Sequence, residues 1–412
     1  MGLGLLLRKP RFVALASLGF AARAMGTTAC ETPRRVPFIL YGAGGVGSAL
    51  LEAIVGARTL HAERYGIRLS AIAICDSSAA VESASGAELD DGALSSLVKH
   101  KADGGKLATA SGTVNAKTEG LSSSDFLSSV VEKYAASEPD AIVVDCTATD
   151  ATVPALVKAA ASLRVVSANK KPFSSDLGTF QALALQPSSP ARVRYEATVG
   201  AGLPVIAAIQ RLVNAADGVT LISGSFSGTL GYVMSGLQAG DSFSSVVLKA
   251  KELGFTEPDP RDDLGGVDVA RKALILARTL GMKLEMSDVA VEALYPDELA
   301  GLSVPDFLSA LPKLDAPFAD KVAAATAEGK VLRYAASVKP PSPEAPSGSL
   351  TVGLLAVPAT SPLGTLSGSD NLVEFYTGWY ASTPLVLRGA GAGTGTTAAG
   401  VLSDMIELAN TR

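Results

Sequence analysis

The stretch that most constrains the fold is RVPFILYGAGGVGSALLEAIVG, residues 35–56, where an apolar run enters a glycine-rich turn and a helix-forming run follows at once. The turn fits G-x-G-x-x-G with Gly42, Gly44 and Gly47. In this pattern the first glycine permits a tight turn, the second lets a pyrophosphate approach the backbone, and the third lets helix and strand pack closely. The N–H groups at the start of the helix then face the phosphates. The pattern predicts a dinucleotide-binding turn; the alternative is a turn that only joins a strand to a helix.

Further apolar runs repeat this order of strand and helix. Strands are expected at RLSAIAICDSS, DAIVVDCTA and RVVSANKKPF, and helix-forming segments follow the last two. Strands alternating with helices predict an α/β fold with a Rossmann-type, doubly wound parallel sheet. Because ligands of such sheets bind beyond the carboxyl ends of the strands, Thr147, Asn169 and Lys170 should face the nicotinamide side of the site. Residues 77–124, rich in Ser, Gly and Ala, predict no definite element.

A second domain is expected after about residue 193, where the pattern changes. Helical segments dominate residues 228–329, and candidate strands follow at KVLRYAASVKP, SLTVGLLAVPA, NLVEFYT and TPLVLRGAG. Helices followed by strands indicate an α+β architecture. We therefore expect a dinucleotide-binding domain at residues 36–192 and a second, α+β domain at residues 193–385.

The composition argues against several classes of protein. The 412 residues are 48% hydrophobic and 18% charged, which is typical of globular folding rather than disorder. A net charge of −5 gives no overall basic field for nucleic acid, and no apolar run is long enough for a membrane span. The three cysteines have no metal-type spacing, so free thiols are expected. The two histidines, His61 and His100, lie in no motif, which argues against a Ser-His-Asp triad or a histidine-ligated zinc site.

Residues 1–35 differ from the rest of the chain, with six cations against one acid and no acid before Glu31. An acid-poor leader rich in Ala, Leu and Arg resembles an organellar transit peptide, which would direct the protein to a plastid or mitochondrion. The alternatives are a secretory signal built on FVALASLGFAARA and a plain disordered extension of a cytoplasmic protein.

The segment TEPDPRDDLGGVDVARK, residues 256–272, holds five carboxylates and three cations beside an apolar run. In a helix starting near Val267, Asp268 and Lys272 lie one turn apart with apolar neighbours on both sides. Such a pair either stabilises the helix or lines a pocket. Prolines stiffen the preceding backbone, so Glu257, Asp263 and Asp268 are candidate ligands for an ammonium group. Lys272 is then a candidate proton donor or a group that polarises a carbonyl.

Six blocks carry a resemblance to a known family: GAGGVGSA, SANKKPFSSDL, YEATVGAGLPVI, GSFSGTLGYV, LGFTEPDPRDDLGGVDVARK and GAGAG…TAAGVLSD. Together, from Phe38 to the C-terminus, they resemble homoserine dehydrogenases, most closely the monofunctional, fungal-like type. The resemblance implies an oxidoreductase that reversibly reduces aspartate 4-semialdehyde to L-homoserine with NAD or NADP, a step toward threonine, isoleucine and methionine. The chain before Phe38 is too short for an aspartate kinase, so we expect a monofunctional protein, and by resemblance a homodimer.

The resemblance also implies roles for single residues. Lys272 matches the catalytic lysine that gives a proton to the aldehyde oxygen, and Lys170 matches a lysine between cofactor and substrate that shares in this transfer. Glu257, Asp263 and Asp268 match residues that bind the substrate and its amine. The cofactor contacts would be Gly42, Gly44, Gly45, Val46, Gly47, Thr147, Lys170 and Gly393. The last of these implies that residues 386–412 complete the nucleotide domain, while residues 193–385 bind substrate and dimerise.

A monovalent-cation loop is implied by EATVGAG in the same resemblance. The carboxylate of Glu196 and the backbone carbonyls of Val199, Ala201 and Leu203 would bind sodium, an ion for which hard oxygen ligands are suited. From the residues alone a plain turn would be expected here.

The choice between NAD and NADP depends on Asp76, which ends the second predicted strand. A carboxylate there accepts hydrogen bonds from the ribose of NAD and repels the 2′-phosphate of NADP. The following SSAAVESASG offers no Arg or Lys to compensate. We therefore expect NAD(H) to be used at least as well as NADP(H); the alternative is that Asp76 caps a turn and points away.

Two functions other than an enzyme of this family are alternatives. One is a noncatalytic nucleotide-sensing protein on the same fold, which would have no need of a proton donor such as Lys272. The other is a thiol-dependent aldehyde dehydrogenase with Cys146 as nucleophile, for which no histidine motif supplies a base.

Overall fold

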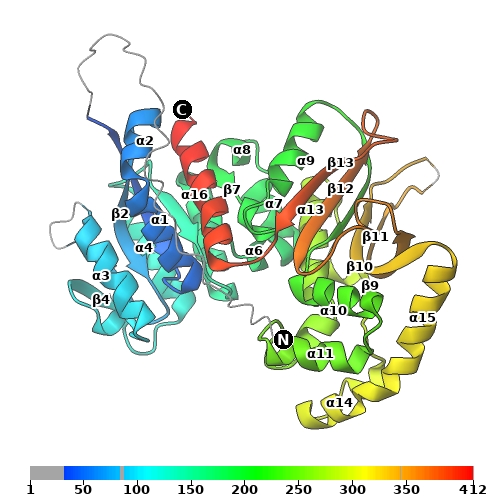
Figure 1. Ribbon diagram of the computed structural model, residues 1–412. Coiled ribbons are helices and arrows are strands. Elements are labelled where there is room, and N and C mark those ends of the chain that lie inside the picture. The colour runs from blue at the N-terminus through cyan, green and yellow to red at the C-terminus, as the bar shows by residue number, and fades with distance from the viewer. Residues whose placement is uncertain (1–31, 84–87, 344, 412) are drawn as a thin grey trace.

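The structure is a computed structural model, and it describes residues 32–83, 88–343 and 345–411. Two sheets lie side by side, each with its own helices, and the C-terminal helix returns to the first sheet (Figure 1). Most of the predicted leader, with Cys30, lies outside the described residues. Its predicted end at residue 35 is too late, because strand β1 (Arg34–Tyr41) already begins at Arg34. Arg35 forms a 2.9 Å ion pair with Glu138, so the folded part includes the last residues assigned to the leader.

The first sheet has the strand order β4-β3-β2-β1-β5-β6-β7. The strands from β2 to β7 in that order run parallel, as predicted. Its parallel strands are β1, β2 (Ile67–Cys75), β5 (Ile142–Asp145), β6 (Arg164–Ser167) and β7 (Val193–Arg194). Because β2 lies on one side of β1 and β5 on the other, the order reverses at β1, which is where ligands bind in such sheets.

Residues 77–124 form an antiparallel edge of this sheet. The elements are β3 (Ala79–Glu82), α3 (Asp91–Ala102) and β4 (Thr113–Ala116). β3 pairs antiparallel with β2 and β4 with β3. Strands of four residues are too short for a period-two pattern to stand out, which explains why the sequence predicted no element here.

Both faces of the first sheet are covered. Phe38 and Leu40 of β1 belong to one apolar core with α1 (Gly45–Gly56) and α16 (Thr394–Asn410). Ile39 and Tyr41 point to the opposite core, with α4 (Ser123–Ala135) and α5 (Val153–Ser162). The remaining helices of this half are α2 (Arg58–Tyr65), α6 (Lys171–Ser174), α7 (Leu177–Ala184) and α8 (Ser189–Arg192).

The second sheet has the order β13-β12-β8-β10-β11-β9 and is antiparallel except between β11 and β9. Its strands are β8 (Val219–Ser225), β9 (Ala290–Val291), β10 (Lys330–Lys339), β11 (Ser349–Pro358), β12 (Asp370–Thr377) and β13 (Leu385–Ala390). The four strands β10 to β13 lie where the sequence predicts them. The sequence missed β8, whose residues VTLISGS mix Ser and Gly with apolar residues.

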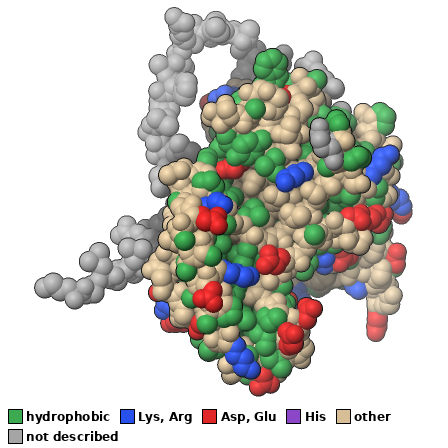
Figure 2. All heavy atoms as spheres, turned by 90° about the vertical axis from the view of Figure 1, so that its right-hand side faces the viewer, with side chains coloured by type: hydrophobic (Ala, Val, Ile, Leu, Met, Phe, Trp, Pro, Cys, Tyr) green, Lys and Arg blue, Asp and Glu red, His purple; other side chains and the backbone are tan. Residues whose placement is uncertain are grey.

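Helices α10 (Gly228–Ala239) and α13 (Val267–Thr279) pack on β10. The other helices here are α9 (Val205–Asn214), α11 (Phe243–Glu252), α12 (Arg261–Leu264), α14 (Val304–Ala310) and α15 (Asp315–Ala327). A separate small core containing Leu363 and Leu372 lies on the sheet. On the side of the molecule that carries β11 and α15, charges of both signs are scattered among apolar side chains (Figure 2). In the described parts of the chain, no helix is long and apolar enough to cross a membrane.

Candidate functional site

The glycine-rich turn has the geometry that the sequence predicts. Gly42 has a φ of 91°, which favours glycine, and a Cβ on Gly47 would lie 1.9 Å from the carbonyl oxygen of Gly42. Gly44 has open space around it and immediately precedes α1. A cavity of about 310 Å³ lies beside this turn. Gly42, Gly44, Asp76 and Thr147 all line it, so a phosphate group could reach the N-terminus of α1.

Gly45 and Val46 open α1 but face different surroundings. A Cβ on Gly45 would lie 2.8 Å from the side chain of Thr394, so this glycine lets α16 approach the turn. Val46 is half-buried and packs against the core shared by α1 and α16. Gly393, with a φ of 119°, precedes α16. The C-terminal helix thus begins beside the nucleotide turn.

A hydrogen-bonded network holds the carboxyl ends of β5 and β6. Asp145 is fully buried and accepts hydrogen bonds from the Thr147 N–H (2.9 Å), the Thr152 hydroxyl (2.7 Å) and the Asn169 side-chain amide (3.0 Å). Burial raises the pKa of Asp145, and these three donors oppose that effect. The network fixes Thr147 and Asn169, and Lys170 follows Asn169 directly.

Three charged side chains meet between the two sheets. Lys170 Nζ lies 2.5 Å from one carboxylate oxygen of Asp268, and Lys272 Nζ lies 2.8 Å from the other. Lys272 is buried and also donates to the carbonyl oxygen of Phe226 at 2.6 Å. Lys170 follows the first sheet, whereas Asp268 and Lys272 belong to α13. We call Lys170, Asp268 and Lys272 the charged triad.

Electrostatics set the protonation states within the charged triad. Burial lowers the pKa of Lys272; the charge of Asp268 opposes this shift and that of Lys170 adds to it. Burial by itself would raise the pKa of Asp268, but Lys272 and Lys170 outweigh it and hold the pKa below its ordinary value. Asp268 therefore stays ionised, and Lys272 loses its proton more easily than an exposed lysine.

The local sequence explains why α13 presents this pair. The helix begins at Val267, as predicted, after Gly266 with a φ of 72°. A Cβ on Gly266 would lie 1.9 Å from the hydroxyl oxygen of Tyr334, so only glycine fits there. Asp268 then occupies the first turn and Lys272 the second, on the face that meets Lys170.

The acids upstream of α13 divide into two groups. Asp259 forms a 2.7 Å ion pair with Arg261, a structural contact. Asp263 accepts a hydrogen bond from the backbone N–H of exposed Glu257 at 2.8 Å. Burial raises the pKa of Asp263, the Glu257 N–H opposes that, and the charges of Glu257 and Asp268 add to it. We call Glu257, Asp263 and Asp268 the acidic group; within the described residues, only Asp268 of the three forms an ion pair.

The EATVGAG loop is a tight, buried turn. The Glu196 carboxylate accepts the backbone N–H groups of Ile206 and Ala207 at the start of α9, at 2.7 and 2.8 Å. Gly200 has a φ of 80° and Ala201 a φ of 57°, an unusual conformation for a residue other than glycine. Burial raises the pKa of Glu196 to about 7, although the α9 N–H groups oppose this shift.

This loop is fastened to the C-terminal helix. Buried Asp404 of α16 accepts the backbone N–H of Glu196 at 3.0 Å. One turn earlier, a Cβ on Gly400 would lie 2.9 Å from the carbonyl oxygen of Ala201. The carbonyl oxygen of Leu203 already accepts the N–H of Val205 at 2.8 Å. Among the residues that the structure describes, no group of three or more His, Cys, Asp and Glu side chains could hold a metal ion.

Comparison with known proteins gives consistent results. A family model for homoserine dehydrogenase matches residues 204–406. The Emericella nidulans homoserine dehydrogenase is 42% identical over 294 residues, which are 68% of this chain and 78% of that protein. This chain belongs to the homoserine dehydrogenase family. The solved structure of a Candida auris protein of unknown function has 34% identity and a TM-score of 0.77, and covers 91% of this chain and 98% of its own.

Other members of the family differ in length. A Haemophilus influenzae bifunctional aspartokinase/homoserine dehydrogenase is 35% identical over 391 residues, which are 94% of this chain but 44% of that protein. The chain therefore spans less than half of the bifunctional relatives that it matches. A hyperthermophilic archaeal homoserine dehydrogenase in complex with NADPH shares the fold, with a TM-score of 0.66, 22% identity, and coverage of 92% of this chain and all of its own.

The Asp76 carboxylate has partners in the structure that the family motifs do not indicate. One carboxylate oxygen accepts from the N–H and hydroxyl of Ser78 at 2.8 and 2.6 Å, and the other from Lys101 Nζ at 3.2 Å and the N–H of Leu107 at 3.0 Å. Asp76 thus caps a turn, as the alternative prediction has it, but it does not point away, because it lines the cavity beside the glycine-rich turn. The prediction that no Arg or Lys compensates Asp76 rests on residues 77–86 alone. Lys101 lies 25 residues after Asp76 and lines the same cavity.

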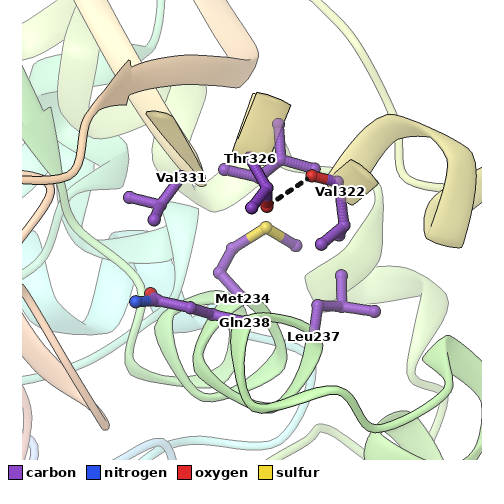
Figure 3. Close-up of a pocket in the computed structure, with 7 residues that line it drawn as sticks. Met234, Leu237, Gln238, Val322, Thr326 and Val331 are labelled. Atoms are coloured by element: carbon purple, nitrogen blue, oxygen red, sulfur yellow. Dashed lines mark hydrogen bonds between the residues drawn. The ribbon is translucent and has the colours of Figure 1, made fainter. Parts of the chain in front are cut away.

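The remaining features lie apart from the charged triad. Burial raises the pKa of the Cys146 thiol well above its usual range, which opposes a thiolate nucleophile. A small cavity of about 30 Å³ lies between α10, α15 and β10 (Figure 3). Met234, Leu237 and Gln238 line it from α10, and Val322 and Thr326 from α15. It holds no ionisable side chain, so it offers none of the acid–base groups that a dehydrogenase of this family needs.

Proposed function

We propose that this chain catalyses the reversible oxidation of L-homoserine to aspartate 4-semialdehyde with NAD or NADP. The observation that carries the proposal is the charged triad, in which a buried lysine with a lowered pKa lies beside a second lysine from the opposite sheet. A noncatalytic nucleotide-sensing protein has no use for such an arrangement. Membership of the homoserine dehydrogenase family supports the substrate.

The nucleotide fits the cavity beside the glycine-rich turn. Gly44 leaves room for a pyrophosphate, and the N-terminus of α1 supplies N–H groups to it. Thr147, at the end of β5, and Gly393, before α16, border the same region from two other directions. A bound nicotinamide would supply the hydride acceptor for the substrate carbon, and the hydride donor in the reverse direction.

Lys272 is the acid–base group for the hydroxyl proton of the substrate. In the oxidation direction its neutral amine accepts the hydroxyl proton of homoserine, and in reduction its ammonium returns a proton to the aldehyde oxygen. Burial favours the neutral form of Lys272 and the charge of Asp268 favours the protonated form, and the net effect is a lowered pKa. Lys170 shares the carboxylate of Asp268 and holds a second positive charge beside the developing alkoxide.

The acidic group formed by Glu257, Asp263 and Asp268 binds the substrate ammonium. Asp268 already has two cationic partners, whereas Glu257 and Asp263 form no ion pair with any described residue and repel each other. A third cation placed there relieves this repulsion. The acidic group therefore selects an alcohol that carries an amine.

The deciding experiment measures reduction of NAD⁺ and NADP⁺ by the protein from residue 32 onward. L-homoserine should be oxidised, and 4-hydroxybutyrate, which lacks the amine, should be oxidised far more slowly. Nucleotide binding without turnover of homoserine would refute the proposal in favour of a nucleotide sensor. Equal rates with both alcohols would refute the role of the acidic group.

We further propose a bound sodium ion at the EATVGAG loop. The carboxylate of Glu196 and the carbonyls of Val199, Ala201 and Leu203 would supply oxygen ligands, and Ala201 has a φ of 57°, an unusual conformation for a residue other than glycine. A cation also offsets the buried charges of Glu196 and Asp404.

A homodimer is proposed from the second sheet. Half-buried Leu355, Val357 and Val386 pack on its small core, and no helix in the described part of the chain belongs to that core. A second copy would cover these apolar side chains. Light scattering that gives the mass of a monomer at micromolar concentration would contradict the proposal.

A further inference from the structure

Arg278 is a buried cation with no part in the steps above. Its side chain is 0% exposed and it lies on α13, the helix that carries Asp268 and Lys272. The guanidinium donates to the carbonyl oxygens of Phe173 at 3.1 Å and Leu284 at 2.9 Å. It also donates to the Glu285 carboxylate at 2.8 Å. Burying a charge costs free energy unless it is paired and hydrogen-bonded, so these contacts are what make the position tolerable.

Through Phe173 directly and through Glu285 indirectly, Arg278 reaches the segment that follows Lys170. Phe173 lies in α6, which starts at Lys171. The second carboxylate oxygen of Glu285 accepts the backbone N–H of Leu177 at 2.8 Å, at the start of α7. Arg278 and Glu285 therefore hold the segment 173–177 at both ends, through backbone groups rather than side chains of that segment.

A second contact leads from α13 back to Lys170 itself. Arg271, two turns before Arg278 on the same face, donates to the hydroxyl oxygen of Ser174 at 3.3 Å. That hydroxyl donates to the carbonyl oxygen of Lys170 at 3.0 Å. One face of α13 thus holds the backbone of the Lys170 turn, while another face presents Asp268 to the Lys170 side chain.

We propose that Arg278, together with Glu285, is a positioning residue that holds the α6 turn on α13 and so sets Lys170 beside Asp268. The two sides of the reacting centre come from different sheets, and the 2.5 Å contact between Lys170 and Asp268 requires their backbones to be fixed relative to each other. The inference rests on the proposed function, since it needs Lys170 to act in the reaction.

The test is a double-mutant cycle on turnover with Arg278→Lys and Lys170→Met. Lysine keeps the charge but loses the planar fork that reaches Phe173, Leu284 and Glu285 together. Because a displacement of about 1 Å can cost about 10²-fold in rate, Arg278→Lys should lower kcat about 10- to 100-fold. In the Lys170→Met background the same change should lower kcat by less than about 3-fold, since residues that act through one another are not additive. Rates are expressed per nucleotide-binding site, which removes the effect of unfolded protein.

Arg333→Lys is the matched control. Arg333 is also a buried arginine, 3% exposed, and its guanidinium donates to the backbone carbonyls of Leu363, Gly364 and Leu366 on the second sheet. It should lower the melting temperature as Arg278→Lys does and leave the rate per site unchanged. Should Arg278→Lys fail to fold, Glu285→Gln takes its place, because it removes the ion pair with Arg278 and keeps the shape of a side chain that is 46% exposed.

The outcomes are distinguishable. If Lys170→Met alone turns over at the wild-type rate, the assignment of Lys170 to the reaction is wrong and the inference falls with it. If Lys170→Met is slow but the two losses multiply, the reaction assignment stands and the positioning role of Arg278 is overturned. A small loss in the double variant relative to Lys170→Met supports the inference.

Discussion

Replacing Asp268 with asparagine should change the pH dependence of turnover. The substitution keeps the shape of the side chain but removes the negative charge shared by Lys170 and Lys272. The charge of Asp268 raises the pKa of Lys272, against burial and Lys170, which lower it. Without that charge the pKa of Lys272 must fall. Because oxidation of homoserine needs the neutral amine, the rising limb of kcat should move to lower pH.

The size of the shift follows from the 2.8 Å separation of Lys272 Nζ and the Asp268 carboxylate oxygen. Coulomb's law gives about 6 kcal/mol at an effective dielectric constant of about 20 and about 1.5 kcal/mol in water. The Asp268 side chain is 46% exposed, so solvent screens the interaction and the lower end applies. About 2 kcal/mol corresponds to a shift of roughly 1.5 pH units in the rising limb.

The assay measures kcat for homoserine oxidation at saturating nucleotide and homoserine. The pH is varied between about 6 and 10, so that the whole rise of kcat with pH is covered. Asp262→Asn is the matched control, because Asp262 is exposed in the same acidic segment and forms no ion pair within the described part of the chain. Asp268→Asn should also raise KM for homoserine, since the ammonium loses a charged partner. A rising limb at the same pH in Asp268→Asn and wild type would refute the electrostatic account of Lys272.

Four further predictions test other parts of the molecule. Lys272→Ala should lower kcat by roughly 10²- to 10⁴-fold with little change in nucleotide affinity, and near wild-type turnover would remove it from the mechanism. Lys101→Ala should reduce kcat/KM for NADP more than for NAD, because Lys101 lines the nucleotide cavity; equal losses would place the 2′-phosphate elsewhere. Sodium chloride should raise the melting temperature more than choline chloride does, and Glu196→Gln should abolish the difference. A fluorescent fusion of residues 1–31 should enter an organelle, and a diffuse cytosolic signal would contradict the transit-peptide prediction.

The sequence predicts most of the first sheet because its signals are local. Gly42 must be glycine because its φ is positive, and Gly47 because a Cβ there would lie 1.9 Å from the carbonyl oxygen of Gly42. Such requirements produce a fixed spacing of glycines in the sequence. The start of α13 at Val267 was predicted for the same reason, since Asp268 and Lys272 are one helical turn apart. Features decided by residues near one another in sequence can be read from the sequence.

Contacts between distant segments could not be predicted in this way. Asp76 stands where an acid that reads the ribose is expected, yet Lys101 and the N–H of Leu107, which saturate it, come from a segment with no recognisable pattern. β8 was missed because its place in the middle of the second sheet is set by pairing with β10 and β12, far away in the chain. No local pattern indicates that Arg278 reaches Phe173, because that contact depends on how the two sheets meet.

The arrangement of charges explains why the charged triad lies between the sheets rather than within one of them. Lys170 and Lys272 repel each other, and a protein that carried both on one rigid element would hold them apart or bury an unpaired cation. Placing Lys170 after β6 and Lys272 on α13 lets Asp268 lie between them, with contacts of 2.5 and 2.8 Å.

As a consequence, the distance between the two lysines depends on the contact between the two halves of the molecule. That contact runs through backbone atoms at Phe173 and Leu177, which Arg278 and Glu285 hold. Substitutions at this contact should therefore change turnover more than they change nucleotide binding. The reason is that the glycine-rich turn and its cavity lie wholly on the side of the first sheet.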